Sequence, residues 1–442
     1  MAKNYTVTFV SLGCPKNTVD TEVMLADMAE RGFILDSSSE NTDFYIVNTC
    51  GFIEPAKQEA FEELRQGIEL KKQGKVRFVA AAGCLVERMG RELAEALPEI
   101  DCLISLCERD KAGELLLKTA KSKGSRKIDT ASGKKFVSND SVRLLTTSPG
   151  SAYLRISEGC GRGCSFCTIP AIRGPFRSKP KAEIIREAQV LSENGVREVN
   201  LIAQDTTGYG KDIGLEDGLC ELLEELAKTD LEWIRILYLY PASVSDKLLD
   251  TIASHKKILN YIDMPIQHID NELLKSMRRT DTEEKTAELI EKIRAKLDKP
   301  VLRTTVISGY PGETEEKHNK LLKFIKWAEF DALGAFAFCP EKDTPAGRMD
   351  NQLPEEIKQK RVGQIMRAQQ EIAFRKNRNM QGKKLTLLTE GFCEDYTQAR
   401  YYGQAPEIDS VCAVPEKQIE PGKFIEAEVA DTSDYDLICR LI

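Results

Sequence analysis

Apolar positions in the first 120 residues fall into short continuous runs separated by longer amphipathic stretches. The runs predict strands over 6–10, 44–47, 77–82 and 102–106, and the stretches between them predict helices over 18–31, 55–72 and up to residue 97. Strands that are apolar along their whole length are typical of a parallel sheet covered on both faces. We therefore expect an open α/β domain over residues 5–120.

The same alternation returns for six rounds in the middle of the chain. Strands are predicted over 152–157, 198–203, 233–239, 259–264, 302–307 and 333–338, with helices between them. Six βα units joined by short turns favour a barrel or partial barrel, whose active site lies at the carboxyl ends of the strands. This second α/β domain is expected over residues 146–376.

The pattern changes again after residue 382. Strands predicted over 385–389, 399–402, 411–414, 424–429 and 437–441 favour a small β-barrel of the oligonucleotide-binding kind, over residues 380–442. Two stretches are predicted to be solvated connectors: the Lys-, Ser- and Gly-rich segment 121–145 and the charged helical segment 354–379. The predicted fold class is α/β, with a small β-barrel at the carboxyl end.

The cysteine content changes the picture. The chain has 442 residues, 13 of them cysteines, and 41% of its residues are hydrophobic. No apolar run approaches the length of a membrane span, and the first residues lack a signal-peptide layout. So many cysteines in such a chain favour a reducing compartment and metal ligation over disulfides. We therefore expect a cytoplasmic protein with no membrane partner.

Three cysteines lie close together after the first predicted strand of the central domain. Cys160, Cys164 and Cys167 are spaced Cys-x3-Cys-x2-Cys in a glycine-rich loop. A zinc site would need a fourth ligand, and the nearest downstream candidates, Cys220 and His255, are distant. Three ligands on a 4Fe-4S cluster, which normally takes four, leave one iron open. The alternative, three structural cysteines, is disfavoured because reduced cysteines rarely gather this closely without a metal.

A second set of cysteines is spread over the amino-terminal domain. Cys14, Cys50 and Cys84 each follow one of the first three predicted strands, and each has a glycine beside it. Because parallel strands end at the same edge of a sheet, these thiols could converge on one ligand. The glycines would allow the backbones to approach closely. On spacing alone, three unrelated buried cysteines remain the alternative.

Together these motifs resemble the radical S-adenosylmethionine (SAM) methylthiotransferase family. The 159–167 loop, with an aromatic residue before its third cysteine, resembles the radical SAM signature. The runs 11–17, 48–53 and 82–85 resemble the family's amino-terminal cluster-ligand segments, and residues 380–442 occupy the position of its TRAM domain. The resemblance implies two 4Fe-4S clusters, one on Cys160, Cys164 and Cys167 and the other on Cys14, Cys50 and Cys84.

The resemblance also implies a division of labour. The first cluster would reduce SAM to methionine and a 5′-deoxyadenosyl radical, which removes hydrogen from an unactivated carbon. The second would hold an exogenous sulfur, accept a methyl group from another SAM and supply the methylthio group. SAM contacts are implied for Phe166, for Gln204 at a predicted strand end, and for Gly309 in a run that resembles the family's adenine-contacting glycine motif.

Two further motifs each allow a functional and a structural interpretation. Arg173 and Arg177 match the family's Arg-Gly-x-x-Arg-Ser run and could bind a substrate carboxylate or a phosphate, or form salt bridges with the barrel. His268, near a predicted strand end, is more often a structural histidine than a ligand.

The family has two substrate classes, a tRNA adenosine beside the anticodon and an aspartate of small-subunit ribosomal protein S-twelve. The run 11–17 (Ser-Leu-Gly-Cys-Pro-Lys-Asn) resembles the protein-modifying branch, because the tRNA branch usually has Gln-Met after the cysteine. Residues 380–442 hold 6 Lys and Arg against 12 Asp and Glu, whereas a tRNA-binding barrel should be basic. An acidic barrel would attract a basic ribosomal protein.

We therefore expect methylthiolation of the β-carbon of that aspartate, with two SAM, a sulfur donor and two 4Fe-4S clusters. Ribosomal protein S-twelve is the expected partner, met through the acidic barrel, and nucleic acid is not the expected substrate. A tRNA methylthiotransferase is the alternative. A non-catalytic iron–sulfur scaffold would leave the second cysteine set and the polar strand ends without a purpose.

Overall fold

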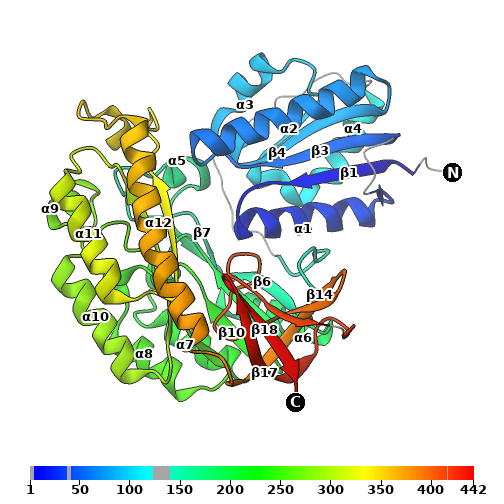
Figure 1. The fold of residues 1–442 in the computed structure, drawn as a ribbon. Helices are drawn as coiled ribbons and strands as arrows, with labels where there is room; N and C mark the ends of the chain where they lie inside the picture. Colours follow the sequence, from blue (N-terminus) through cyan, green and yellow to red (C-terminus); the bar gives the residue numbers. More distant parts are fainter. Residues whose placement is uncertain (1–3, 37–40, 123–139, 416) are drawn as a thin grey trace. The chain divides into compact units, whose positions relative to one another are not determined.

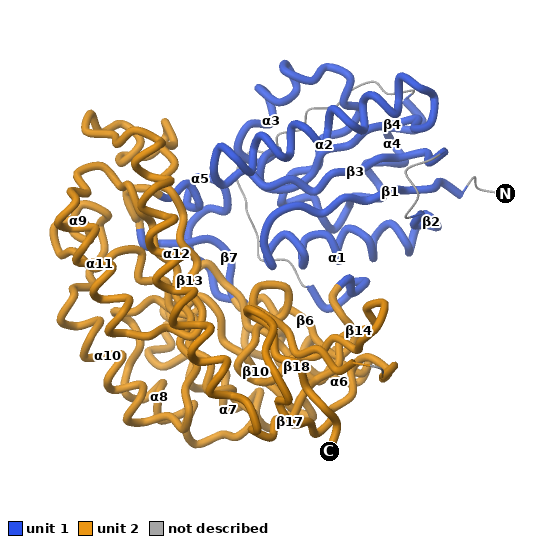
Figure 2. Tube along the Cα trace, viewed as in Figure 1, with its two compact units in different colours: residues 1–146, 157–162, 167–179 blue, residues 147–156, 163–166, 180–442 orange. Residues whose placement is uncertain are grey.

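The computed structural model describes residues 4–36, 41–122, 140–415 and 417–442. Figure 2 shows how the chain divides into two compact units. The first contains residues 1–146, 157–162 and 167–179, and the second contains 147–156, 163–166 and 180–442. The division runs through the 159–167 loop, so its cysteines are shared between the units.

The first unit is built on a five-stranded parallel sheet with strand order β2-β1-β3-β4-β5. The strands are β1 (Thr6–Ser11), β2 (Ile34–Leu35), β3 (Thr42–Thr49), β4 (Val76–Gly83) and β5 (Cys102–Ile104). The helices are α1 (Pro15–Glu30), α2 (Glu54–Lys72), α3 (Cys84–Ala96) and α4 (Ala112–Lys121). Figure 1 shows α1 on one side of the sheet and α2 on the other. The prediction of an open α/β domain is confirmed.

Two separate cores explain why these strands are apolar along their whole length. Phe44 and Ile46 pack toward one core together with residues of α1 and α4. Tyr45 and Val47, one position along the same strand, pack into the other core with residues of α2 and α3. Because successive side chains of a strand point to opposite faces, both sets must be apolar. β2 was not predicted because its two residues are exposed at the sheet edge.

The second unit begins with a six-stranded parallel sheet in the order β13-β12-β11-β10-β9-β6. The strands are β6 (Ser151–Arg155), β9 (Glu198–Ile202), β10 (Trp233–Ile236), β11 (Ile258–Asp263), β12 (Val301–Ser308) and β13 (Ala332–Ala337). The main helices between them are α6 (Lys181–Glu193), α7 (Gly218–Leu226), α8 (Asp246–Ser254), α10 (Glu283–Lys296) and α11 (Glu315–Ala328). Each strand pairs with the one that precedes it in this alternation, and the sheet is not closed. This is the predicted partial (β/α)6 barrel.

The prediction that 354–379 is a solvated connector is wrong. The segment forms α12 (Glu355–Arg378), which packs against α11 and β13 (Figure 1). Ile365 and Ile372, seven residues apart, are buried on one face of this helix. No helix among the described residues is both long enough and apolar enough to cross a membrane.

Most of the predicted linker 121–145 lies outside the described residues. The part that is described, from residue 140, is packed against the first unit instead of being solvated. Asp140 is fully buried with its carboxylate 3.1 Å from the ammonium of Lys179, and Arg143 pairs with Glu22 at 2.9 Å.

The carboxyl-terminal strands close into a barrel in the order β14-β15-β16-β18-β17, as predicted. They are β14 (Lys384–Cys393), β15 (Tyr396–Tyr401), β16 (Cys412–Pro415), β17 (Phe424–Ser433) and β18 (Asp436–Leu441). The barrel has a small apolar core of its own, made of Leu387, Ala399, Cys412, Val414, Ala427, Val429, Leu437 and Cys439. It is nevertheless part of the second unit, because a buried polar network joins it to the six-stranded sheet.

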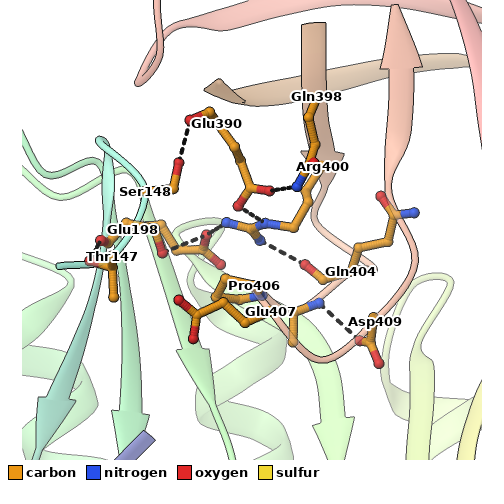
Figure 3. Close-up of polar contacts among 12 residues, drawn as sticks. Thr147, Ser148, Glu198, Glu390, Gln398, Arg400, Gln404, Pro406, Glu407 and Asp409 are labelled. Atoms are coloured by element: carbon orange, nitrogen blue, oxygen red, sulfur yellow. Dashed lines mark hydrogen bonds and ion pairs between the residues drawn. The ribbon is translucent and has the colours of Figure 1, made fainter. Parts of the chain in front are cut away.

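Glu198 is at the centre of this network (Figure 3). Its carboxylate is fully buried and forms ion pairs with Arg235, at 2.8 Å, and with Arg400 of the barrel. Burial would raise the pKa of Glu198, but the two guanidinium groups outweigh it and lower the pKa. Arg400 also pairs with Glu390, so each buried charge has an opposite partner.

The barrel segment between β15 and β16 completes the junction. Its Tyr402 carbonyl accepts a 2.7 Å hydrogen bond from Arg235, and Asp409 accepts one from the Tyr261 hydroxyl. Arg303 pairs with the same Asp409 at 3.3 Å. Buried ion pairs contribute little net stability but penalise any arrangement that leaves a charge unpaired. The junction therefore fixes the position of the barrel on the sheet.

We predict that Glu198→Gln destabilises the protein by about 3–5 kcal/mol, because it leaves two buried guanidinium groups without their shared carboxylate. Urea denaturation followed by circular dichroism measures this change. The control is Arg440→Ala, which removes an exposed 3.7 Å pair with Glu428 and should cost less than about 1 kcal/mol. Equal effects of the two substitutions would contradict the assignment.

Candidate active site

The cysteines of the first unit lie at one edge of its sheet. β1, β3 and β4 are neighbouring parallel strands, and Cys14, Cys50 and Cys84 follow their carboxyl ends. Cys14 is the N-cap residue of α1 and Cys84 is the first residue of α3. A helix amino terminus favours negative charge, so both positions suit a thiolate.

The glycines beside these cysteines let the three segments lie in contact. A Cβ atom on Gly13 would be 3.1 Å from the Cβ of Cys50, and one on Gly51 would be 2.9 Å from the Cys84 carbonyl oxygen. A Cβ on Gly83 would be 2.8 Å from the Thr49 carbonyl oxygen. The contacts at Gly51 and Gly83 are too close for a side chain and the one at Gly13 is tight, so the predicted close approach of the backbones is present.

Asn17 connects all three segments and was not singled out from the sequence. Its side-chain amide donates hydrogen bonds to the carbonyls of Leu12, at 2.9 Å, and Thr49, at 3.0 Å, just before Cys14 and Cys50. Its side-chain oxygen accepts a 3.3 Å hydrogen bond from the Cys84 thiol. Asn17 is 1% exposed. The only sequence signal for it was its place in the run 11–17.

A short helix links this edge to the 159–167 loop within the first unit. α5 (Ile169–Arg173) begins two residues after Cys167. Thr168, between them, donates a 3.1 Å hydrogen bond to the carbonyl of Phe52, and Ile172 packs against Cys84. The backbone that carries Cys167 therefore continues directly into contact with the backbone that carries Cys50 and Cys84.

Arg173, the last residue of α5, is buried. Its guanidinium pairs with Asp20 at 2.8 Å and Glu158 at 3.0 Å, and Nη2 donates a 3.3 Å hydrogen bond to the Cys84 sulfur. Of the interpretations offered from the sequence, substrate or phosphate binding does not fit this residue, because its donors are already engaged. It forms salt bridges, one with Asp20 of α1 and one with Glu158, which lies in the range predicted for the central domain.

Burial dominates the electrostatics of two of these thiols. Burial raises the pKa of Cys84 to about 12, against the opposing effect of Arg173. Burial also raises the pKa of Cys50. Such groups become thiolates when a metal replaces the proton.

The 159–167 loop is shaped by glycine at its start. Gly159 has a φ of +74°, and a Cβ there would be 2.2 Å from the Pro175 carbonyl oxygen. Cys160, which follows, donates its backbone N–H to Gly174 at 3.2 Å. Cys160, Cys164 and Cys167 are all partly exposed.

Two of the three expected SAM-contact residues lie in one region of the second unit. Phe166 packs in an apolar cluster that includes Tyr310 and Phe338. Tyr310, next to Gly309, also shares a 2.9 Å hydrogen bond with the hydroxyl of Ser165. Gln204 follows the carboxyl end of β9, outside this apolar cluster.

Glu313, which the sequence did not single out as a charged centre, holds the Gly309 turn. Its buried carboxylate accepts a hydrogen bond from the Gly309 N–H and pairs with Arg361 at 3.2 Å. His268 and His318 each place a ring nitrogen 3.5 Å away. Burial would raise the pKa of Glu313, but the two imidazoles outweigh it and hold the pKa at about 2. His268 is therefore structural, as expected.

The donor set fits iron–sulfur chemistry. No three His, Cys, Asp or Glu side chains in the described ranges are already gathered closely enough to hold a metal ion. However, each cysteine set provides three sulfur ligands and lacks the fourth ligand of a structural zinc site, and the strand-end cysteines follow adjacent strands. Two 4Fe-4S clusters, each with one open iron, would require three sulfur ligands apiece.

Three family models match the chain. They are described as Radical SAM superfamily, over residues 154–325, Uncharacterized protein family UPF0004, over 6–105, and TRAM domain, over 382–442. The solved structure of the radical SAM methyltransferase TsrM from Kitasatospora setae aligns with a TM-score of 0.55 and 15% identity, covering 78% of this chain and 77% of that one. Fold and models define a protein of the radical SAM class.

The curated relatives are more specific. The chain is 41% identical to ribosomal protein uS12 methylthiotransferase RimO of Syntrophomonas wolfei, over 97% of this chain and 98% of the relative. It is 39% identical to the protein of the same name from Geobacter sulfurreducens, over 99% and 98%. The chain belongs to the RimO family of radical SAM methylthiotransferases.

We predict that Gly83→Ala removes about half of the bound iron, because the new Cβ would push apart the Cys50 and Cys84 segments. Iron and sulfide analysis of the anaerobically reconstituted protein measures this loss. Gly74→Ala is the matched control: Gly74 also has a positive φ, +74°, but no atom lies within 4 Å of its Cβ position. It should cost only about 1 kcal/mol and retain all the iron.

We predict that Glu313→Gln destabilises the protein by about 3 kcal/mol at pH 7. Because the folded pKa is lowered from 4.5 to about 2, the carboxylate stabilises the fold fully above pH 4.5 and loses this effect as the pH falls toward 2. The difference in unfolding free energy between wild type and variant should shrink over that range. Glu315→Gln, an exposed neighbour that also contacts Arg361, should show no such difference.

Proposed function

We propose that this protein adds a methylthio group to the β-carbon of an aspartate in ribosomal protein uS12, using two SAM and a sulfur donor. The observation that carries the proposal is that α5, within the first unit, connects Cys167 of one three-cysteine set with the edge of the sheet that carries Cys14, Cys50 and Cys84. The relatives named above are uS12 methylthiotransferases and match this chain over nearly its full length.

The chain divides the work among its segments. Residues 5–120 hold one 4Fe-4S cluster on Cys14, Cys50 and Cys84. Residues 146–376 hold the other on Cys160, Cys164 and Cys167, and residues 121–145 link these two domains in the sequence. Residues 380–442 form the TRAM domain. When bound, the clusters supply a carbon-centred radical and a transferable methylthio group, which side chains alone cannot provide.

The chain's own residues position these groups. Ser165 anchors the cluster loop to the Gly309 turn through Tyr310, and Phe166 packs beside it. Phe166, Gln204 and Gly309 are the proposed SAM contacts. Holding the reacting groups in one geometry replaces a collision between separate molecules, which is a large part of catalysis.

The TRAM barrel is proposed to meet the basic ribosomal protein. Part of its negative charge is internal, because Glu390 and Asp409 pair with buried arginines. Among the described residues the exposed acidic side chains are Glu394, Asp395, Glu407, Glu420, Glu426, Asp431 and Asp434, and the exposed basic ones are Lys383, Lys384, Lys417, Lys423 and Arg440. The surface is thus mildly acidic, which suits a basic protein better than tRNA.

The proposed reaction takes place in the cytoplasm, where thiols stay reduced and ribosomes are assembled. The alternative activity, methylthiolation of a tRNA adenosine, keeps the same two clusters and differs only in the substrate. Substrate identity is therefore what the experiment must decide.

Mass spectrometry of the anaerobically reconstituted enzyme makes this decision. Given SAM, sulfide, a reductant and either a uS12 peptide or tRNA, it should add the mass of a methylthio group to the peptide aspartate. Cys14→Ala should abolish this product and still cleave SAM. Modification of tRNA alone would contradict the proposed substrate.

A further inference from the structure

Arg173 is a buried cation in contact with Cys84, one of the proposed cluster ligands. The guanidinium Nη2 is 3.3 Å from the Cys84 sulfur and 2.8 Å from both a carboxylate oxygen of Asp20 and the side-chain oxygen of Asn17. The side chain is 2% exposed, and an arginine stays protonated even when buried. A permanent positive charge and an N–H donor are therefore held at a sulfur atom in a site with little water.

The carboxylates around Arg173 are shared with other buried cations. Asp20 is shared, because Arg109 approaches its other carboxylate oxygen to 3.4 Å. Asp140 balances Lys179 at 3.1 Å and lies 3.9 Å from Arg109. In the ion pairs described, Arg173, Arg109 and Lys179 thus share Asp20, Asp140 and Glu158. Three cysteine thiolates would add negative charge beside these pairs.

The potential of an iron–sulfur cluster depends on its net charge, on hydrogen bonds to its sulfurs and on its exposure. Arg173 changes the first two in the same direction, because both a nearby positive charge and an N–H···S hydrogen bond favour the reduced form. We propose that Arg173 is a positioning residue that raises the reduction potential of the cluster on Cys14, Cys50 and Cys84.

This role rests on the proposed function. In that function, Arg173 would favour transfer of the methylthio group to the substrate. If a substrate carbon radical took a methylthio group from a cluster held by Cys14, Cys50 and Cys84, the new C–S bond would use the radical electron and one electron of the Fe–S bond that breaks. The other electron of that bond would remain on the iron. A cation that stabilises added negative charge there favours transfer, and α5 places this cation only six residues after Cys167.

The test is an EPR-monitored redox titration of the full-length protein. In a Cys160→Ala, Cys164→Ala, Cys167→Ala background, only the amino-terminal cluster contributes to the signal. Arg173→Met should lower the midpoint potential of this cluster. Arg173→Lys, which keeps the charge but has a single nitrogen for the sulfur and the carboxylates, should lower it less.

Arg109→Met is the matched control. Arg109 is also buried and shares Asp20, and it pairs with Asp140 at 3.9 Å and donates a 2.9 Å hydrogen bond to the Leu106 carbonyl. Both Met variants should lose thermal stability, and only Arg173→Met should shift the potential. An unchanged potential in Arg173→Met, or an equal shift in Arg109→Met, would overturn the proposal.

If Arg173→Met binds no iron, the Lys variant decides: a lowered potential supports the role and an unchanged one refutes it. If the background protein with Arg173 intact binds no cluster, then the proposed function fails, and not only the role of Arg173. The two failures are thus distinguishable.

Discussion

The buried contact between Arg173 and the strand-end cysteine edge is the constraint on which the proposed chemistry depends. In the proposed reaction, the substrate carbon radical would have to form close to the sulfur that the second cluster would hold. Within the first unit, α5 connects candidate ligands of both clusters, because it begins two residues after Cys167 and its last residue contacts Cys84. Two carboxylates, Asp20 and Glu158, fix that residue so that it cannot turn toward solvent.

A second buried network fixes the carboxyl-terminal barrel to the six-stranded sheet. Glu198 pairs with Arg235 of its own sheet and with Arg400 of the barrel, so buried ion pairs fix the barrel to the sheet. Apolar packing would hold two domains together in several orientations. Buried ion pairs restrict the choice, because any other arrangement leaves a charge unpaired in a low-dielectric interior.

The alternation of strands and helices was predictable because both faces of each parallel sheet are buried. A strand buried on both faces needs apolar residues at successive positions, and such runs are visible in the sequence. α12 was judged wrongly because only a narrow stripe, marked by Ile365 and Ile372, faces the protein. The roles of Asn17 and Arg173 could not be derived, since their side chains meet across 156 residues. The cysteine sets were recognisable from spacing and strand position, but the cation beside them depends on tertiary pairing.

The most direct test of two independent clusters in one chain is Mössbauer spectroscopy of the Cys160→Ala, Cys164→Ala, Cys167→Ala protein after anaerobic reconstitution with 57Fe. The account predicts a single 4Fe-4S cluster of about four irons per chain, with SAM cleavage abolished. A spectrum without a cubane cluster would contradict it, because the strand-end cysteines would then hold no iron of their own.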